Sequence, residues 1–60
     1  MTNETSKHNI LIVEDHELTR FGLKTTFSDV DFIETIYEAP SAKKAYEIVK
    51  NNKIDIIIMD

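Results

Sequence analysis

Three apolar runs alternate with two stretches of helical periodicity along the chain. Residues 10–13 form a continuous, mostly β-branched run, and residues 54–59 form another that only Asp55 interrupts. Runs of this kind are typical of strands covered on both faces, as in a parallel sheet. Residues 33–37 are a shorter β-rich segment and predict a further strand between these two.

Residues 16–28 predict the first helix. Leu18, Leu23 and Phe27 fall on one broad arc of that helix, and this arc is expected to face the sheet. Gly22 lies on the same arc and weakens a helix by about 1 kcal/mol relative to alanine. We therefore expect that Gly22 allows the helix to approach the sheet closely. The alternative is that the glycine has no structural role and its cost is tolerated.

The second helix is predicted after the Glu38–Ala39–Pro40–Ser41 break, with Ser41 as its N-cap. Apolar residues then recur at i, i+3, i+4 and i+7, which is the amphipathic pattern, at Ala42, Ala45, Tyr46 and Val49. Residues 51–52 are both asparagine and are expected to end the helix.

The resulting order, β-α-β-α-β, predicts an α/β fold with right-handed crossovers and a doubly wound parallel sheet. If the first strand lies between the other two, the strand order is 2-1-3. Ligands of such sheets bind outside the carboxyl ends of the strands, where the strand order reverses. The predicted binding point is therefore between the first and third strands.

Composition restricts the partners and the cellular location that we expect for this chain. The net charge is −4 and no basic run is present, so the chain is a poor surface for nucleic acid. Residues 1–8 are polar and predict a disordered leader rather than a signal peptide, and no apolar run is long enough to span a membrane. There is no cysteine. We therefore expect a cytoplasmic protein without a membrane contact.

Acidic residues end two of the predicted strands: Glu14 and Asp15 follow the first, and Asp60 follows the third. Carboxylates that meet at one sheet edge repel one another, and a divalent cation removes the repulsion. Oxygen ligands select Mg²⁺ or Ca²⁺, and the small number of carboxylates matches Mg²⁺, which keeps several waters. Singly, each acid could instead be a solvated loop residue, and Asp15 could cap the first helix.

Residues 10–16, Ile-Leu-Ile-Val-Glu-Asp-His, and residues 54–60, Ile-Asp-Ile-Ile-Ile-Met-Asp, resemble the first and third strand motifs of two-component response-regulator receiver domains. Residues 16–23 resemble the NarL/FixJ subgroup, which has a LuxR-type output. The resemblance covers residues 9–60. It implies a flavodoxin-like fold and the N-terminal half of a receiver domain, truncated after the third strand.

The resemblance also implies roles for the acids. Asp60 would be the phosphoacceptor, Asp15 and Asp60 would bind Mg²⁺ directly, and Glu14 would act through a water. The donor would be a sensor histidine kinase or a phosphotransfer protein, and the exposed side of the first helix, with Arg20 and Lys24, would be its docking face. Such a domain is a signalling module rather than an enzyme, with slow self-dephosphorylation at most. It would control transcription through a DNA-binding output domain that is absent from these residues.

Two other functions stay open at this point. A degenerate receiver would act only as a docking module. A Mg²⁺-dependent aspartyl phosphohydrolase also uses an aspartate nucleophile, but it would need a second acid two residues after Asp60. Homodimerisation is also left open, because the third strand would be an apolar edge. His16 directly follows the acidic pair and could touch the site, and the favoured interpretation is a solvent-exposed residue of the first helical turn.

Overall fold

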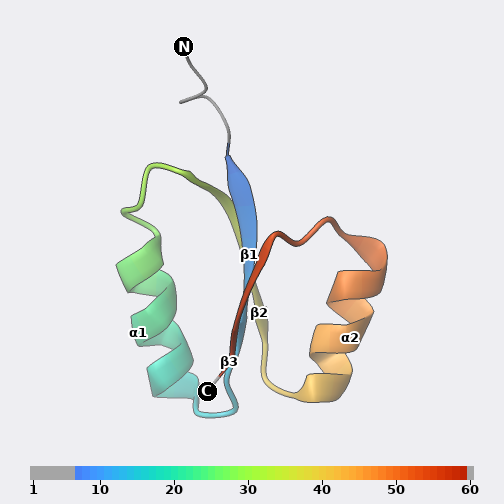
Figure 1. Cartoon of the computed structure of the whole chain (residues 1–60). Helices are drawn as coiled ribbons and strands as arrows, with labels where there is room; N and C mark the ends of the chain where they lie inside the picture. Colours follow the sequence, from blue (N-terminus) through green and yellow to red (C-terminus); the bar gives the residue numbers. More distant parts are fainter. Residues whose placement is uncertain (1–6, 60) are drawn as a thin grey trace.

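A computed structural model describes residues 7–59 and has the predicted β-α-β-α-β order (Figure 1). The elements are β1 (His8–Val13), α1 (Glu17–Phe27), β2 (Ile33–Ala39), α2 (Ala42–Asn51) and β3 (Ile56–Met59). Neither α1 nor α2, the helices of the described part of the chain, is long and apolar enough to cross a membrane.

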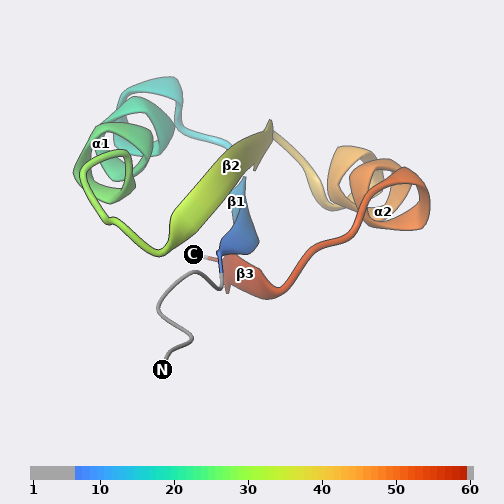
Figure 2. The same ribbon diagram turned by 90° about the horizontal axis from the view of Figure 1, so that it is seen from above.

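The three strands form a parallel sheet in the order β2-β1-β3, which confirms the predicted order 2-1-3. The two helices lie on opposite sides of this sheet, as Figure 2 shows from above. The architecture is therefore the expected flavodoxin-like, doubly wound α/β arrangement. Because β1 is the middle strand, its carboxyl end is flanked by the ends of both neighbours.

The core follows from the apolar run in β1. Ile10, Leu11 and Ile12 are at most 1% exposed. Leu11 packs in one cluster with Val13, Ala39 and Ala45, on the face that α2 covers. Successive side chains of a strand point to opposite faces, so Ile10 and Ile12 face the α1 side. The run is apolar throughout because β1 is covered on both faces.

The predicted inner arc of α1 is only partly correct. Leu23 and Phe27 are half-buried, but Leu18 is 85% exposed, and no residue of α1, all of which the structure describes, is buried. The expected close approach at Gly22 is wrong. That glycine is exposed, and a Cβ built on it would meet no atom of the described residues within 4 Å, apart from its chain neighbours and the backbone of its own helix.

In α2 the caps are as expected but the inward face is shifted. Ser41 is the N-cap, and its hydroxyl accepts a hydrogen bond from the Lys44 amide at 3.2 Å. Ala45 is buried and Ile48 packs against the core, whereas Tyr46 is 66% exposed. Of the predicted face, Ala45 is confirmed as buried, but Tyr46 and Val49 are exposed, and Ile48 packs against the core in their place.

Side-chain amides close the C-terminal end of α2. Asn51 Nδ2 donates to the Glu47 carbonyl at 2.9 Å, and Asn52 Nδ2 donates to the Ile48 carbonyl at 3.0 Å. Ile48 is among the last four residues of the helix, whose carbonyls lack intrahelical backbone partners, so the Asn52 amide satisfies one of them. The asparagine pair thus ends the helix as predicted, with an extended backbone at Asn52.

The strand boundaries differ from the prediction at two points. β1 begins at His8, whose amide donates to the Phe32 carbonyl at 2.8 Å, so the last residue of the predicted 1–8 leader belongs to the strand. Residues 1–6 lie outside the described residues. β3 begins only at Ile56, because the Asp55 carboxylate accepts the Asn9 amide at 2.8 Å, where a backbone carbonyl would accept in a regular ladder.

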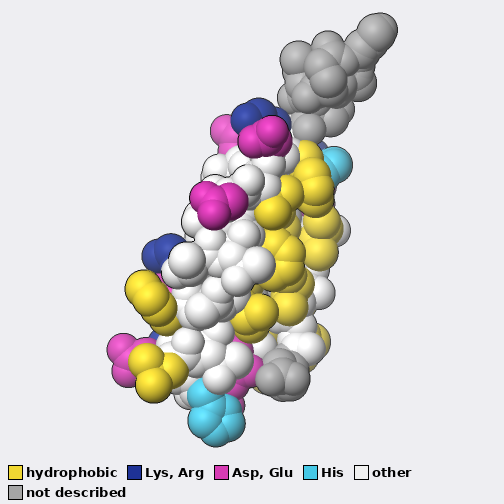
Figure 3. Space-filling model, turned by 90° about the vertical axis from the view of Figure 1, so that its left-hand side faces the viewer, with side chains coloured by type: hydrophobic (Ala, Val, Ile, Leu, Met, Phe, Trp, Pro, Cys, Tyr) yellow, Lys and Arg dark blue, Asp and Glu magenta, His cyan; other side chains and the backbone are white. Residues whose placement is uncertain are grey.

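β3 is the edge strand on one side of the sheet, and its side chains are largely exposed. The exposed fractions are 39% for Ile56, 48% for Ile57 and 67% for Met59. Figure 3 shows apolar side chains as a continuous strip beside α1 on this side of the molecule. The sequence prediction of an isoleucine-rich edge is confirmed within the described residues.

Candidate functional site

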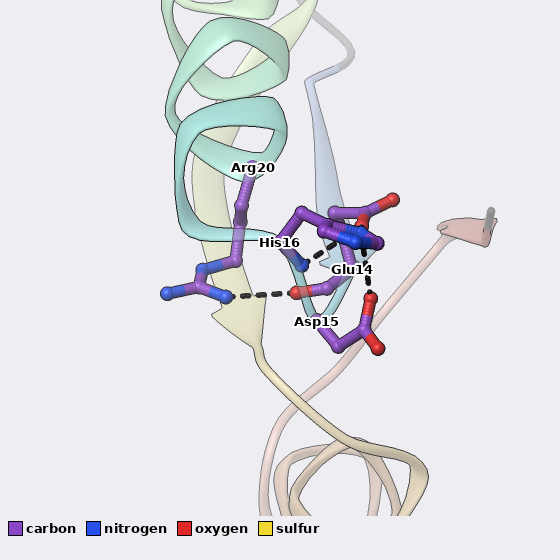
Figure 4. Close-up of polar contacts among 4 residues, drawn as sticks. All are labelled: Glu14, Asp15, His16 and Arg20. Carbon is purple, nitrogen blue, oxygen red and sulfur yellow. Dashed lines mark hydrogen bonds and ion pairs between the residues drawn. The ribbon is translucent and has the colours of Figure 1, made fainter.

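Three consecutive polar residues link β1 to α1 at the carboxyl end of the middle strand (Figure 4). They are Glu14, Asp15 and His16. Each offers one ligand atom, and these atoms all lie within 4.8 Å of one another. The link is short because β1 ends at Val13 and α1 begins at Glu17, so the three side chains have little room to separate.

Glu14 is buried, with 4% of the residue exposed, so the alternative of a solvated loop residue is wrong for this acid. Its amide donates to the Ala39 carbonyl at 3.0 Å and so extends the pairing between β1 and β2 by one residue. Buried carboxylates need hydrogen-bond donors. The His16 amide supplies one, at 2.9 Å from Glu14 Oε2.

Asp15 points outward, and 78% of its side chain is exposed. Its Oδ1 lies 3.0 Å from His16 Nδ1. The alternative that Asp15 caps α1 is wrong, because the N-cap position belongs to His16. An exposed carboxylate beside a buried one leaves an open side at which water and a larger ligand can approach.

His16 is exposed, as expected, and it is also part of the cluster, which is the alternative that its position directly after the two acids left open. Its side chain is 79% exposed, yet Nδ1 lies 2.9 Å from Glu14 Oε2 and 3.0 Å from Asp15 Oδ1. Its extended backbone, with φ −88° and ψ 116°, lets the imidazole turn back over the link. The only signal in the sequence was that His16 directly follows the two acids.

Arg20 fixes α1 against the strand ends. Its Nη1 donates to the Glu14 carbonyl at 2.8 Å, and its Nε lies 3.4 Å from Glu38 Oε1 at the end of β2. Lys24 Nζ lies 2.9 Å from the other oxygen of Glu38. The Arg20 side chain is only 18% exposed, so the prediction that it belongs to an exposed docking face is wrong.

Asp60, the predicted phosphoacceptor, lies outside the described residues, and its role stays a prediction. The structure does describe Met59, the residue before it. Met59 is the register partner of Val13, the residue before Glu14. The carboxyl ends of β1 and β3 are thus at the same edge of the sheet, as the strand-order argument required.

The donor set of this edge fits a hard divalent cation. Glu14 and Asp15 supply carboxylate oxygens, which Mg²⁺ and Ca²⁺ prefer. Mg²⁺ usually binds through one or two carboxylates and keeps several waters. The exposure of Asp15 leaves space for those waters.

Comparison with known proteins gives a consistent family. The sequence model of one protein family, the response regulator receiver domain, matches residues 10–60. Response regulator UvrY of Escherichia coli (strain K12) is 35% identical over 52 residues, which are 87% of this chain. Response regulator protein VraR of Staphylococcus saprophyticus is 37% identical over 51 residues, 85% of the chain.

A third relative, the uncharacterized transcriptional regulatory protein YhcZ of Bacillus subtilis (strain 168), is 35% identical over 51 residues, 85% of the chain. The chain spans about a quarter of the length of these relatives, 24% in each case. No solved structure gives a significant match.

Proposed function

This chain belongs to the family of response regulator receiver domains, and we propose that it accepts a phosphoryl group on Asp60 with Mg²⁺ bound beside it. The donor in this proposal is a phosphohistidine of a sensor histidine kinase or of a phosphotransfer protein. The family is that of two-component signalling, and the relatives are consistent with the NarL/FixJ subgroup.

One observation carries the proposal: the two acids that follow β1 are at the sheet edge where β3 also ends. The pairing of Val13 with Met59 supports it, because Asp60 is the next residue after Met59 in the sequence. The family match also extends to residue 60. In this arrangement the acids of both strand ends would serve one cation.

The different surroundings of the two described acids support different roles. Asp15, with its exposed side chain, would hold Mg²⁺ directly together with Asp60. Glu14 is buried and its Oε2 already accepts the His16 amide, so it would act through a water bound to the cation. When bound, Mg²⁺ would offset the negative charges of the carboxylates and of the phosphoryl oxygens.

Asp60 would then act as the nucleophile. Phosphoryl transfer passes through a loose transition state, so correct placement of a carboxylate oxygen matters more than its basicity. The acyl phosphate formed would add charge at the sheet edge, and charge of this kind can bias a two-state surface. In this proposal the chain is a signalling module rather than an enzyme, with slow self-dephosphorylation at most. The proposed location is the cytoplasm.

The output we propose is control of transcription through a DNA-binding domain. The relative YhcZ is described as a transcriptional regulatory protein, which is the support for this output. The receiver residues themselves are not proposed to touch DNA, because their net charge is −4.

The test is phosphorylation of the protein by acetyl phosphate in the presence of Mg²⁺, read by intact-protein mass. We expect the mass gain of one phosphoryl group on the unchanged protein and on Asp31→Asn, a matched control in the turn before β2. We expect no gain on Asp60→Asn, and none when the metal is removed by chelation. Labelling that persists in Asp60→Asn would overturn the assignment. Unlabelled wild-type protein would favour a receiver that only docks.

A further inference from the structure

The imidazole of His16 touches both described acids through one atom. Its Nδ1 lies 2.9 Å from Glu14 Oε2 and 3.0 Å from Asp15 Oδ1. The side chain is 79% exposed, and it makes no cap hydrogen bond at the α1 N-terminus within the described residues. Its contacts with the two carboxylates therefore explain the orientation of the imidazole.

We infer that His16 is a positioning residue of the proposed Mg²⁺ site, because its imidazole holds the Asp15 and Glu14 carboxylates close together before the cation binds. This inference rests on the proposed function. Two adjacent carboxylates repel each other, and an exposed aspartate can turn its side chain freely into water. An Nδ1–H group between them donates toward both carboxylates, which reduces their repulsion and restricts the Asp15 side chain. Less ordering is then needed when the cation binds.

The two acids depend on His16 to different degrees. Glu14 Oε2 also accepts the His16 amide at 2.9 Å, and this bond survives any change of the His16 side chain. Asp15 is exposed, and its described ion-pair contact is with the imidazole. Loss of the imidazole should therefore release Asp15 more than Glu14. Groups that orient a metal ligand change metal affinity by about 10–100-fold, and the exposure of His16 places it near the lower figure.

Three variants separate positioning from other roles. His16→Ala removes the contact atom. His16→Asn returns a nitrogen, Nδ2, the same number of bonds from the backbone as Nδ1, and asparagine also suits an N-cap. His8→Ala is the matched control, because His8 also lies near a carboxylate, Asp55 at 3.8 Å, but at the opposite end of β1.

The measurement is a titration of ¹⁵N-labelled protein with MgCl₂, followed through the backbone amide resonances of residues 14–16. We expect His16→Ala to weaken Mg²⁺ binding about 10-fold, and His16→Asn to recover most of that loss. We expect His8→Ala to leave the affinity unchanged. The remaining amide resonances of His16→Ala should overlay on those of the unchanged protein, since a general disturbance of the fold would move them.

Equal affinity of His16→Ala and wild type would overturn the inference. Tighter binding by His16→Ala would also overturn it, because the imidazole would then compete with the cation for the carboxylates. If His16→Asn bound Mg²⁺ as weakly as His16→Ala, a nitrogen at this position would not be what positions the two acids. Wild-type protein that does not bind Mg²⁺ would instead overturn the proposed function.

Discussion

Replacing Arg20 by methionine should destabilise the chain by about 2–3 kcal/mol. The largest part is the charged hydrogen bond from Nη1 to the Glu14 carbonyl at 2.8 Å, which is worth about 1.5–3 kcal/mol for a charged donor. The contact of Nε with Glu38 Oε1 at 3.4 Å adds at most about 1 kcal/mol, because the Glu38 side chain is 32% exposed. Methionine keeps an unbranched apolar stem, so the loss of packing is small.

Lys24→Met is the matched control for this change. Lys24 Nζ lies closer to Glu38 than Arg20 does, at 2.9 Å, but its side chain is 50% exposed. Exposed ion pairs contribute about 0–1 kcal/mol, so this variant should lose little stability. A double-mutant cycle between Arg20 and Glu38 should give a coupling below about 1 kcal/mol, because the carbonyl contact does not involve Glu38.

The assay is urea unfolding followed by far-ultraviolet circular dichroism, at about 0.1 M and about 1 M NaCl. A fixed concentration of trimethylamine N-oxide in every sample keeps a folded baseline for the weaker variants. The small effect of Lys24→Met should vanish at high salt, and most of the Arg20→Met effect should remain. The reasoning is refuted if Arg20→Met costs no more than Lys24→Met, or if its cost disappears at high salt.

Two further changes act on the helices and can be measured by the same unfolding assay. Gly22→Ala should stabilise the chain by about 0.5–1 kcal/mol, because the added methyl meets no described atom within 4 Å and the helix loses a flexible residue. A neutral or negative effect would contradict this. Ser41→Ala should cost about 1 kcal/mol through loss of the hydrogen bond to the Lys44 amide, whereas Ser41→Asp should restore most of it.

The sequence predicts the order and type of the elements well, because that order depends on local patterns. The β1 run is apolar throughout and the structure buries it, and the Ser41 cap is a short-range signal. The inward faces of the helices are less predictable, because they depend on where each helix sits on the sheet. Leu18 and Tyr46 match an apolar arc in the sequence, but both are exposed.

The candidate site shows the same division. Glu14 and Asp15 were predicted from their position after an apolar strand, and the structure places both at the carboxyl end of β1. The contact of His16 with the acids was the less favoured alternative, and two features were not predicted at all: the burial of Glu14 and the inward turn of Arg20. Each depends on side-chain torsions and on long-range packing, which residue spacing does not determine. Asp60 stays a prediction, because it lies outside the described residues.

The central position of β1 in the sheet also has a consequence for folding during synthesis on the ribosome. β1 is synthesised before β2 and β3, the two strands with which it pairs. Its Val13 can pair with Met59 only after the chain between these two residues has been synthesised. At about 5–20 residues per second, this interval lasts roughly two to ten seconds. During that time Ile10, Leu11 and Ile12, the largest fully buried side chains of the described residues, have no complete sheet to enter. The strand that anchors the native sheet is thus the one that a nascent-chain chaperone has the longest opportunity to bind.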